Sequence, residues 1–154
     1  MDTILIRPAR LDDLDFLLEF EQAMIEAERP YDPTIKRGPT RYYDLPRLIE
    51  SPDAEIVVAE IDGVVIASGY ARIEKAEEYY EHTHHSYLGF MYVVPEHRGK
   101  GVNKRVLDKL LAWSQKRGVG EIRLEVYTEN AAAIRAYEKA GFESNILTMR
   151  TRAD

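Results

Sequence analysis

The segment that most constrains the fold is FMYVVPEHRGKGVN, residues 90–103, where an apolar β-type run ends at Pro95 and a glycine-rich turn leads into an amphipathic helix. The first backbone N–H groups of a helix have no intrahelical partners, and Gly99 and Gly101 would let an anion approach the main chain closely. Positive charge surrounds this turn, on Arg98, Lys100, Lys104 and Arg105. The pattern predicts an α/β unit that binds phosphate. It is not a Walker loop, because no Ser or Thr follows a Gly-Lys pair.

The rest of the chain alternates between strand and helix patterns. Strands are predicted over Thr3–Arg7, Glu55–Ile61, Val64–Ile73, Ser86–Val94, Glu121–Tyr127 and Phe142–Thr151. Helices are predicted from Leu11 to about Arg29, around Leu45–Ile49, from Val102 to Arg117 and over Asn130–Ala140. Asp62-Gly63 suits a two-residue hairpin turn. The predicted order, β-α-α-β-β-β-α-β-α-β, indicates helices flanking a mixed, largely antiparallel sheet.

Length and composition exclude several classes of protein. A chain of 154 residues fits one domain, residues 1–154. With 21 Lys and Arg against 27 Asp and Glu, the net charge is −6, which argues against nucleic acid and anionic membranes as partners. There is no cysteine, so disulfides, thiolate metal sites and a cysteine acyl-enzyme are excluded. The acidic N-terminus and the lack of a long apolar run lead us to expect a cytoplasmic protein.

A second motif, TENAAAIRAYEKAGF over residues 128–142, completes a signature. The pair V-P-x-x-R-G-x-G and N-x-x-A-x-x-x-Y-x-x-x-G-F resembles the GCN5-related N-acetyltransferases (GNAT), and the resemblance covers most of the chain. It implies a GNAT-like fold and acetyl-coenzyme A as cosubstrate. It also implies direct transfer of the acetyl group to a primary amine of a small molecule, within a ternary complex.

The resemblance also implies which residues hold the coenzyme. The strand before the turn bulges in relatives and offers its backbone to the pantetheine arm, and the turn amides hold the pyrophosphate. The expected cofactor-binding residues are Met91, Tyr92, Val93, Val94, Arg98, Gly99, Lys100, Gly101, Val102, Asn103, Asn130, Ala133 and Tyr137. Asn103 departs from the usual Gly or Ala, and it could either add a hydrogen bond or tighten the site. In the alternative interpretation the strand is ordinary core and Asn130 only caps its helix.

Two residues are candidates for proton transfer. Tyr137 lies about two helical turns after Asn130, so both can face one groove, and a phenol there could protonate the leaving thiolate. The alternative is a packed core tyrosine. A protonated amine needs a base, yet the strand Tyr87–Val94 has no Asp or Glu. Glu125 matches a glutamate proposed as base in the similar N-terminal ribosomal-protein acetyltransferases, and otherwise it is a solvent-facing strand carboxylate.

Other chemistry is disfavoured. His82, His84 and His85 lie near Glu81, but strand alternation sends adjacent histidines to opposite faces, so we expect no metal. Ser68, in A-S-G, lacks the G-x-S-x-G pattern of a hydrolase elbow, so a serine triad is not expected.

Two alternatives for the function stay open: a protein N-terminal acetyltransferase, and a non-catalytic protein that binds or senses acyl-coenzyme A. A cationic acceptor amine is expected if two acidic stretches border the acceptor entrance; otherwise their carboxylates are merely solvated. These stretches contain Glu26, Glu28 and Asp32, and Glu74, Glu77, Glu78 and Glu81. The sequence leaves the acceptor and the oligomeric state open, a homodimer included.

Overall fold

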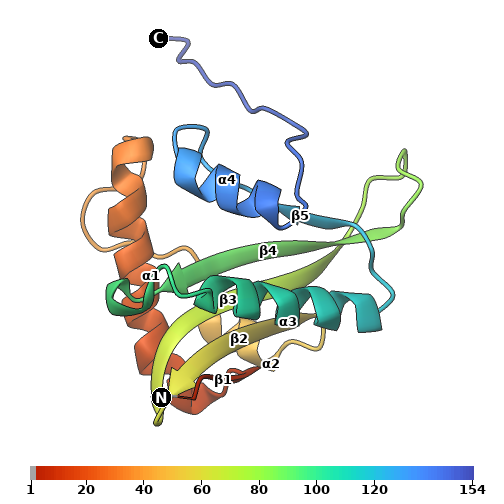
Figure 1. Cartoon of the computed structure of the whole chain (residues 1–154). Coiled ribbons are helices and arrows are strands. Elements are labelled where there is room, and N and C mark those ends of the chain that lie inside the picture. Colours follow the sequence, from red (N-terminus) through yellow and green to blue (C-terminus); the bar gives the residue numbers. More distant parts are fainter. Residues whose placement is uncertain (1–2) are drawn as a thin grey trace.

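The computed structural model describes residues 3–154 (Figure 1). The strands are β1 (Leu5–Pro8), β2 (Ala54–Ile61), β3 (Val64–Lys75), β4 (His84–Val93) and β5 (Ile122–Leu124). The helices are α1 (Leu14–Glu28), α2 (Leu45–Glu50), α3 (Val102–Lys116) and α4 (Ala131–Lys139), with short 3-10 helices at Leu11–Asp13, Arg29–Tyr31 and Pro95–His97. None of the helices in this described range is long and apolar enough to cross a membrane.

The sheet follows chain order, β1-β2-β3-β4-β5. Neighbouring strands from β1 to β4 are antiparallel, whereas β4 and β5 are parallel. The predicted hairpin between β2 and β3 is confirmed, because Asp62 and Gly63 both have positive φ, 51° and 82°. The predicted mixed, largely antiparallel sheet with flanking helices is therefore the observed fold.

Helices cover both faces of the sheet, and β2 accordingly carries apolar residues on both. Val57 and Ala59 face α3 on one side, and the alternate residues Ile56 and Val58 face α1 and α2 on the other. The α3 core residues are Val102, Val106, Leu107 and Leu110, and those of the opposite face include Leu17, Phe20, Leu45, Tyr70 and Phe90. Each fully buried aliphatic side chain contributes about 1.5–3 kcal/mol.

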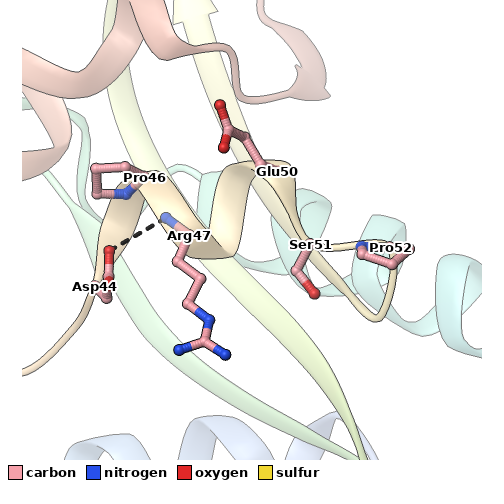
Figure 2. Close-up of a pocket in the computed structure, with 6 residues that line it drawn as sticks. All are labelled: Asp44, Pro46, Arg47, Glu50, Ser51 and Pro52. Carbon is pink, nitrogen blue, oxygen red and sulfur yellow. Dashed lines mark hydrogen bonds between the residues drawn. The ribbon is translucent and has the colours of Figure 1, made fainter.

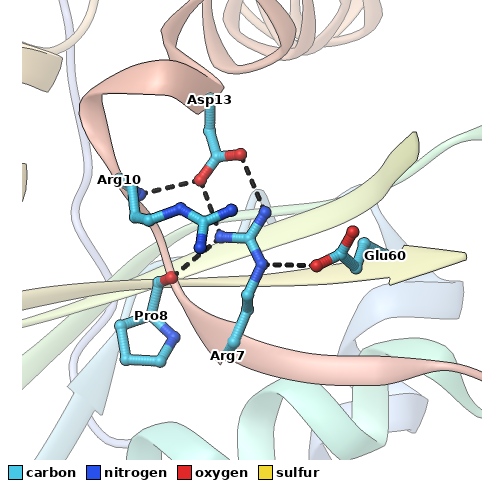
Figure 3. A network of polar contacts seen from close by, with 5 residues as sticks. All are labelled: Arg7, Pro8, Arg10, Asp13 and Glu60. Carbon is cyan, nitrogen blue, oxygen red and sulfur yellow. Dashed lines mark hydrogen bonds and ion pairs between the residues drawn. The ribbon is translucent and has the colours of Figure 1, made fainter. Parts of the chain in front are cut away.

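A charged network joins the first strand to the rest of the sheet (Figure 3). The Arg7 guanidinium donates to both oxygens of Asp13, at 2.8 and 2.9 Å, and its Nε donates to Glu60 at 2.6 Å. Asp13 also accepts a hydrogen bond from the Arg10 amide at 2.7 Å. The hydrogen bonds from Arg7 have the largest effect on the pKa of Asp13 and lower it, whereas burial acts in the opposite direction. The network holds the start of α1 onto β1 and β2.

The sequence prediction fails at the C-terminal end of the sheet. The predicted strand over Phe142–Thr151 forms no ladder, and residues 142–154 are irregular. The predicted strand over Glu121–Tyr127 is shortened to Ile122–Leu124. β-type side chains favour an extended backbone, but a strand also needs a neighbouring strand for its hydrogen bonds. Within residues 3–154, no strand pairs with the outer edge of β5.

Candidate active site

The predicted anion-binding turn has the backbone that the sequence requires. Gly99 and Gly101 have φ of 76° and 78°, in the left-handed region that favours glycine. Gly101 is the N-cap residue of α3 and provides no side-chain cap. Among the turn, loop and cap hydrogen bonds of residues 3–154, none has a backbone N–H of residues 99–104 as its donor. A Cβ built on either glycine meets no atom within 4 Å, so the space beside the turn is open.

The basic side chains around the turn are partly engaged by the protein. Arg98 donates from Nε to the Val93 carbonyl at 2.8 Å and lies over the Tyr92 ring, 5.5 Å from its centroid. Lys104 pairs with Asp108 at 2.8 Å in an exposed contact. Arg98 therefore ties the turn to the end of β4 while keeping its charge beside the turn.

Strand β4 bulges directly before the turn. Phe90 has a φ of 58°, unusual for a bulky residue, and the pairing with β3 shifts between Ser68 and Tyr70. The Ser68 hydroxyl donates to the Phe90 carbonyl at 2.9 Å, which fixes the bulge. Gly69 lies opposite it in a crowded position, where a Cβ would lie 2.6 Å from the Met91 sulfur and 2.9 Å from Cγ1 of Val106.

Strands β4 and β5 part at the bulge. Their parallel pairing runs only from Ser86 to Leu88 on β4, opposite Ile122 to Leu124 on β5. Beyond Leu88 the edge of β4 has no strand partner on this side within the described chain. The side chains of Met91 and Val93 pack into the core on the α3 face. The backbone edge of this stretch is therefore open to a ligand on the β5 side.

Helix α4 brings Tyr137 close to the turn. Asn130 caps the helix by accepting from the Ala133 amide at 3.2 Å. Burial raises the pKa of Tyr137, while a side-chain hydrogen bond from Asn103 acts in the opposite direction. Tyr137 also packs edge-on against Phe142, with ring centroids 5.7 Å apart. The structure thus joins Asn103, the one departure in the turn motif, to the candidate acid through a contact that no sequence pattern indicates.

Glu125 directly follows β5, at the opening where β4 and β5 part. Its carboxylate accepts a hydrogen bond from the Tyr87 phenol at 2.9 Å. Burial and this carboxylate raise the pKa of Tyr87. Arg72 lies 5.4 Å from the centroid of the Tyr87 ring and pairs with Glu74. Sequence reasoning missed Tyr87, because only the parallel pairing of β4 with β5, which sets Tyr87 opposite Arg123, brings its phenol within reach of Glu125 two residues later.

Aromatic and acidic residues gather where α1 ends. Tyr31 stacks on Tyr127 with centroids 5.5 Å apart. Burial raises the pKa of Tyr127, and the negative charges of Glu28, Asp32 and Glu125 raise it further. Glu28 and Asp32, from the first predicted acidic stretch, therefore lie near Tyr127, two residues after the candidate base.

The second acidic stretch lies elsewhere. Glu77, Glu78 and Glu81 are exposed in the connection between β3 and β4, on the opposite side of the molecule from the end of α1 (Figure 1). Glu74 is occupied by Arg72 and by His85, whose Nε2 lies 3.1 Å away. The two stretches do not border one entrance.

A surface hollow beside α2 lies apart from these residues (Figure 2). It is lined by Asp44, Pro46, Arg47, Glu50, Ser51 and Pro52. Asp44 caps α2 through the Arg47 amide at 3.2 Å. The hollow contains none of the residues that the sequence singles out for chemistry.

Comparison with known proteins identifies a family and several relatives. The model of the acetyltransferase (GNAT) family matches residues 20–142. An uncharacterized N-acetyltransferase of Methanocaldococcus jannaschii, MJ1207, is 29% identical over 92% of this chain. An aminoglycoside N(6')-acetyltransferase type 1 of Stenotrophomonas maltophilia is 28% identical over 62% of the chain. The [ribosomal protein bS18]-alanine N-acetyltransferase of Escherichia coli K12 is 42% identical over 32% of the chain. The chain spans 61%, 63% and 34% of these three relatives' lengths.

Solved structures share the fold. The BH1408 protein of Bacillus halodurans, in a tetramutant form, superposes with a TM-score of 0.84 at 18% identity, covering 96% of this chain and 99% of its own. A predicted acetyltransferase of Clostridium acetobutylicum, crystallised with acetyl-CoA, superposes with a TM-score of 0.76 at 18% identity, covering 97% of this chain and 96% of its own. At this identity the likeness is one of fold.

Proposed function

Because the chain belongs to the acetyltransferase (GNAT) family, we propose that it is an acetyl-CoA-dependent N-acetyltransferase. It passes the acetyl group directly to a primary amine of a small molecule within a ternary complex. The observation that carries this proposal is the juxtaposition of two backbone features. The unpartnered amides at the start of α3 follow directly after the stretch of β4 that has parted from β5.

The turn suits the diphosphate of coenzyme A. Amides from Gly99 to Asn103 would hold its oxygens at the positive end of α3. Open space beside Gly99 and Gly101 fits a ligand that lies against the main chain. The pantetheine arm would pair with the free edge of β4 from Met91 to Val94, where backbone donors can also polarise the thioester carbonyl.

The chemistry needs one proton donor and one acceptor. The amine nitrogen forms a bond to the thioester carbon, the carbon–sulfur bond breaks, and sulfur leaves as a thiolate. Tyr137 would protonate that thiolate. Its raised pKa keeps the phenol protonated at neutral pH, as a general acid requires. The Asn103 amide would position the phenol, which gives the departure from Gly or Ala a role.

Glu125 would receive the proton that the amine loses, directly or through water. The Tyr87 hydrogen bond fixes this carboxylate beside the opening, and its other oxygen makes no side-chain contact within residues 3–154. The carboxylate is exposed, so solvent can carry the proton away from it. This arrangement replaces the strand carboxylate that β4 lacks.

A small molecule is favoured as acceptor by the similarity to the aminoglycoside acetyltransferase. A protein N-terminus is the second candidate. The bS18-alanine acetyltransferase is 42% identical to this chain over 50 residues. The segment LEVYTENAAAIRAYEKAGF also resembles the N-terminal ribosomal-protein acetyltransferases. That segment carries Glu125, Asn130 and Tyr137.

Release of free thiol from acetyl-CoA tests the proposal across matched panels of small amines, polyamines, amino acids and peptides with free N-termini. We expect release that depends on a small amine, with an acetylated amine detected by mass spectrometry. Preference for peptides by a large factor in kcat/KM would favour the N-terminal alternative. Tight binding of acetyl-CoA with no release for any acceptor would favour a binding protein and contradict the proposal.

A further inference from the structure

Tyr70, in the middle of β3, is a buried tyrosine whose hydroxyl has no partner in the protein. The residue is only 3% exposed, and its ring packs into the core on the α1 face, edge-on against Tyr43 with centroids 5.4 Å apart. No hydrogen bond within the described chain engages the hydroxyl. The fully enclosed polar side-chain atoms that lack a partner there belong to Tyr42, His82 and His85, so the Tyr70 hydroxyl instead reaches the surface. The packing needs only the ring, which leaves the hydroxyl available to a group outside the core.

The Tyr70 hydroxyl lies where β4 and β5 part. Tyr70 pairs with Gly89 in the register of β3 and β4, and a Cβ built on Gly89 would lie 2.7 Å from the Tyr70 hydroxyl oxygen. The pairing of β4 with β5 ends at Leu88, so Gly89 is the first residue of the open edge. A side chain at Gly89 would displace the phenol. Glycine there therefore lets the hydroxyl lie at the start of the opening.

The candidate base faces the same place. Glu125 is the first residue after β5 and comes level with Gly89 in the parallel register. Tyr87, whose phenol donates to one oxygen of Glu125, has its ring centroid 6.4 Å from that of Tyr70. Burial raises the pKa of Tyr70 most, Arg72 opposes this effect, and the charge of Glu125 adds to it. The Tyr70 hydroxyl and the Glu125 carboxylate thus flank one stretch of free β4 edge.

We propose that the Tyr70 hydroxyl accepts a hydrogen bond from the attacking amine and thereby selects primary over secondary amines. This inference rests on the proposed function. A neutral primary amine directs its lone pair at the thioester carbon and keeps two N–H groups. One faces the free oxygen of Glu125, which takes that proton as the carbon–nitrogen bond forms, while the thiolate that leaves is protonated by Tyr137. The other N–H donates to the Tyr70 oxygen and stays on the product amide.

A secondary amine cannot make both contacts. Its single N–H is needed at Glu125, so its second carbon substituent lies against the Tyr70 hydroxyl. The lost hydrogen bond and the desolvated hydroxyl should lower reactivity by about 10- to 100-fold. Because its pKa is raised, Tyr70 stays neutral, so it accepts the hydrogen bond without competing with Glu125 for the proton.

Tyr70→Phe tests the proposal with a matched pair of amines, putrescine and its derivative methylated on both nitrogens. We expect wild-type protein to favour putrescine in kcat/KM by about 10- to 100-fold. The variant should lose most of this preference, because only its activity toward putrescine falls. Its melting temperature and its Kd for coenzyme A should stay unchanged, since the hydroxyl has no partner in the protein. Tyr79→Phe, at a residue that is 80% exposed, is the matched control and should keep the wild-type preference.

If another primary amine of the acceptor panel reacts faster, that amine and its N-methyl derivative replace the pair. Equal losses toward the two amines would overturn the inference, because the substitution would then disturb the site as a whole. An unchanged preference would also overturn it and assign the selection to another group. A wild type that acetylates no amine of the panel would overturn the proposed function and this inference with it, so the two failures are distinguishable.

Discussion

At the scale of single residues, the proposed general acid Tyr137 can be tested by removing its hydroxyl. Tyr137→Phe should lower kcat by about 10²- to 10⁴-fold, because only the donated proton is lost. Affinity for coenzyme A should change little, since the ring still packs against Phe142. The measurement is steady-state thiol release, with coenzyme binding followed separately by calorimetry. Tyr79→Phe, at a residue that is 80% exposed, is the control and should have no effect.

The pH dependence of kcat adds a second readout for Tyr137. Its pKa is raised above that of a free phenol, about 10. The acid form therefore persists to higher pH than for an exposed tyrosine, and activity should fall on the alkaline side only above that value. A Tyr137→Phe variant with wild-type turnover would reduce this residue to a packing role.

Glu125 can be separated from its hydrogen-bond partner. Glu125→Gln keeps an oxygen that accepts from Tyr87 but removes the basic carboxylate. We expect kcat to fall by about 10²-fold and the acidic limb of the pH profile to disappear or move. Glu129→Gln, at an exposed residue a few positions later, is the control. An unchanged profile, with chemistry shown to limit the rate, would assign the proton to bulk solvent.

At the scale of elements, the Arg7 network fixes β1 and the start of α1 to β2. Its side chains are only 13%, 6% and 16% exposed, for Arg7, Asp13 and Glu60. Arg7→Met leaves two carboxylates buried without their cation and should lower the free energy of unfolding by about 3 kcal/mol at pH 7. Lys109→Met, which removes an exposed charge from α3, should change it by less than about 0.5 kcal/mol.

The same network predicts a pH dependence of stability. The pKa of Asp13 is lower in the folded protein than in the unfolded chain, so the unfolded state binds more protons at acidic pH. The stabilisation is complete above the ordinary aspartate pKa of about 3.9 and is lost as pH falls through the folded value. Urea titrations should show the wild-type advantage over Arg7→Met shrinking below pH 4. An advantage that is constant down to pH 2 would contradict this account.

The elements also show what the sequence could predict. Hydrophobic periodicity located the helices and the strands up to β4, because the apolar residues that set the pattern in most of these segments are the ones that pack into the core. Residues 142–154 carry a strand pattern without a partner in the described chain, so periodicity alone could not reveal that no ladder forms. The positive φ of Phe90 at the bulge accompanies a hydrogen bond from the Ser68 hydroxyl on the neighbouring strand, and only the strand register brings these two residues together.

The sequence also indicated part of the geometry of the candidate site. Motif spacing identified the turn and Tyr137, because both depend on local helix geometry. The Asn103 contact with Tyr137 and the Tyr87 bond to Glu125 join different elements, so they needed the tertiary structure. Their roles in coenzyme binding and catalysis remain predictions.

At the scale of the whole molecule, charge is unevenly placed. The net charge is −6, and Glu28 and Asp32 lie near Tyr127, whereas Glu77 and Glu78 lie across the molecule. We expect kcat/KM to favour a dicationic amine over a matched monocationic one at low salt, and added salt to reduce that preference. Glu28→Gln should weaken the preference, while Glu78→Gln should not. Equal constants for the two amines at low salt would leave these carboxylates without a role in acceptor choice.

The central claim is that the turn at the start of α3 holds the diphosphate of coenzyme A, and calorimetric titration of Gly101→Glu tests it most directly. The change places a carboxylate among the expected phosphate contacts, each worth about 1.5–3 kcal/mol, so the Kd for coenzyme A should rise about 100-fold. Gly118→Glu is the matched control, because Gly118 follows the other end of α3 with a similar φ, 75° against 78°, and with equally open space. The account predicts weak binding by folded Gly101→Glu and wild-type binding by Gly118→Glu. Unchanged affinity in folded Gly101→Glu would contradict it.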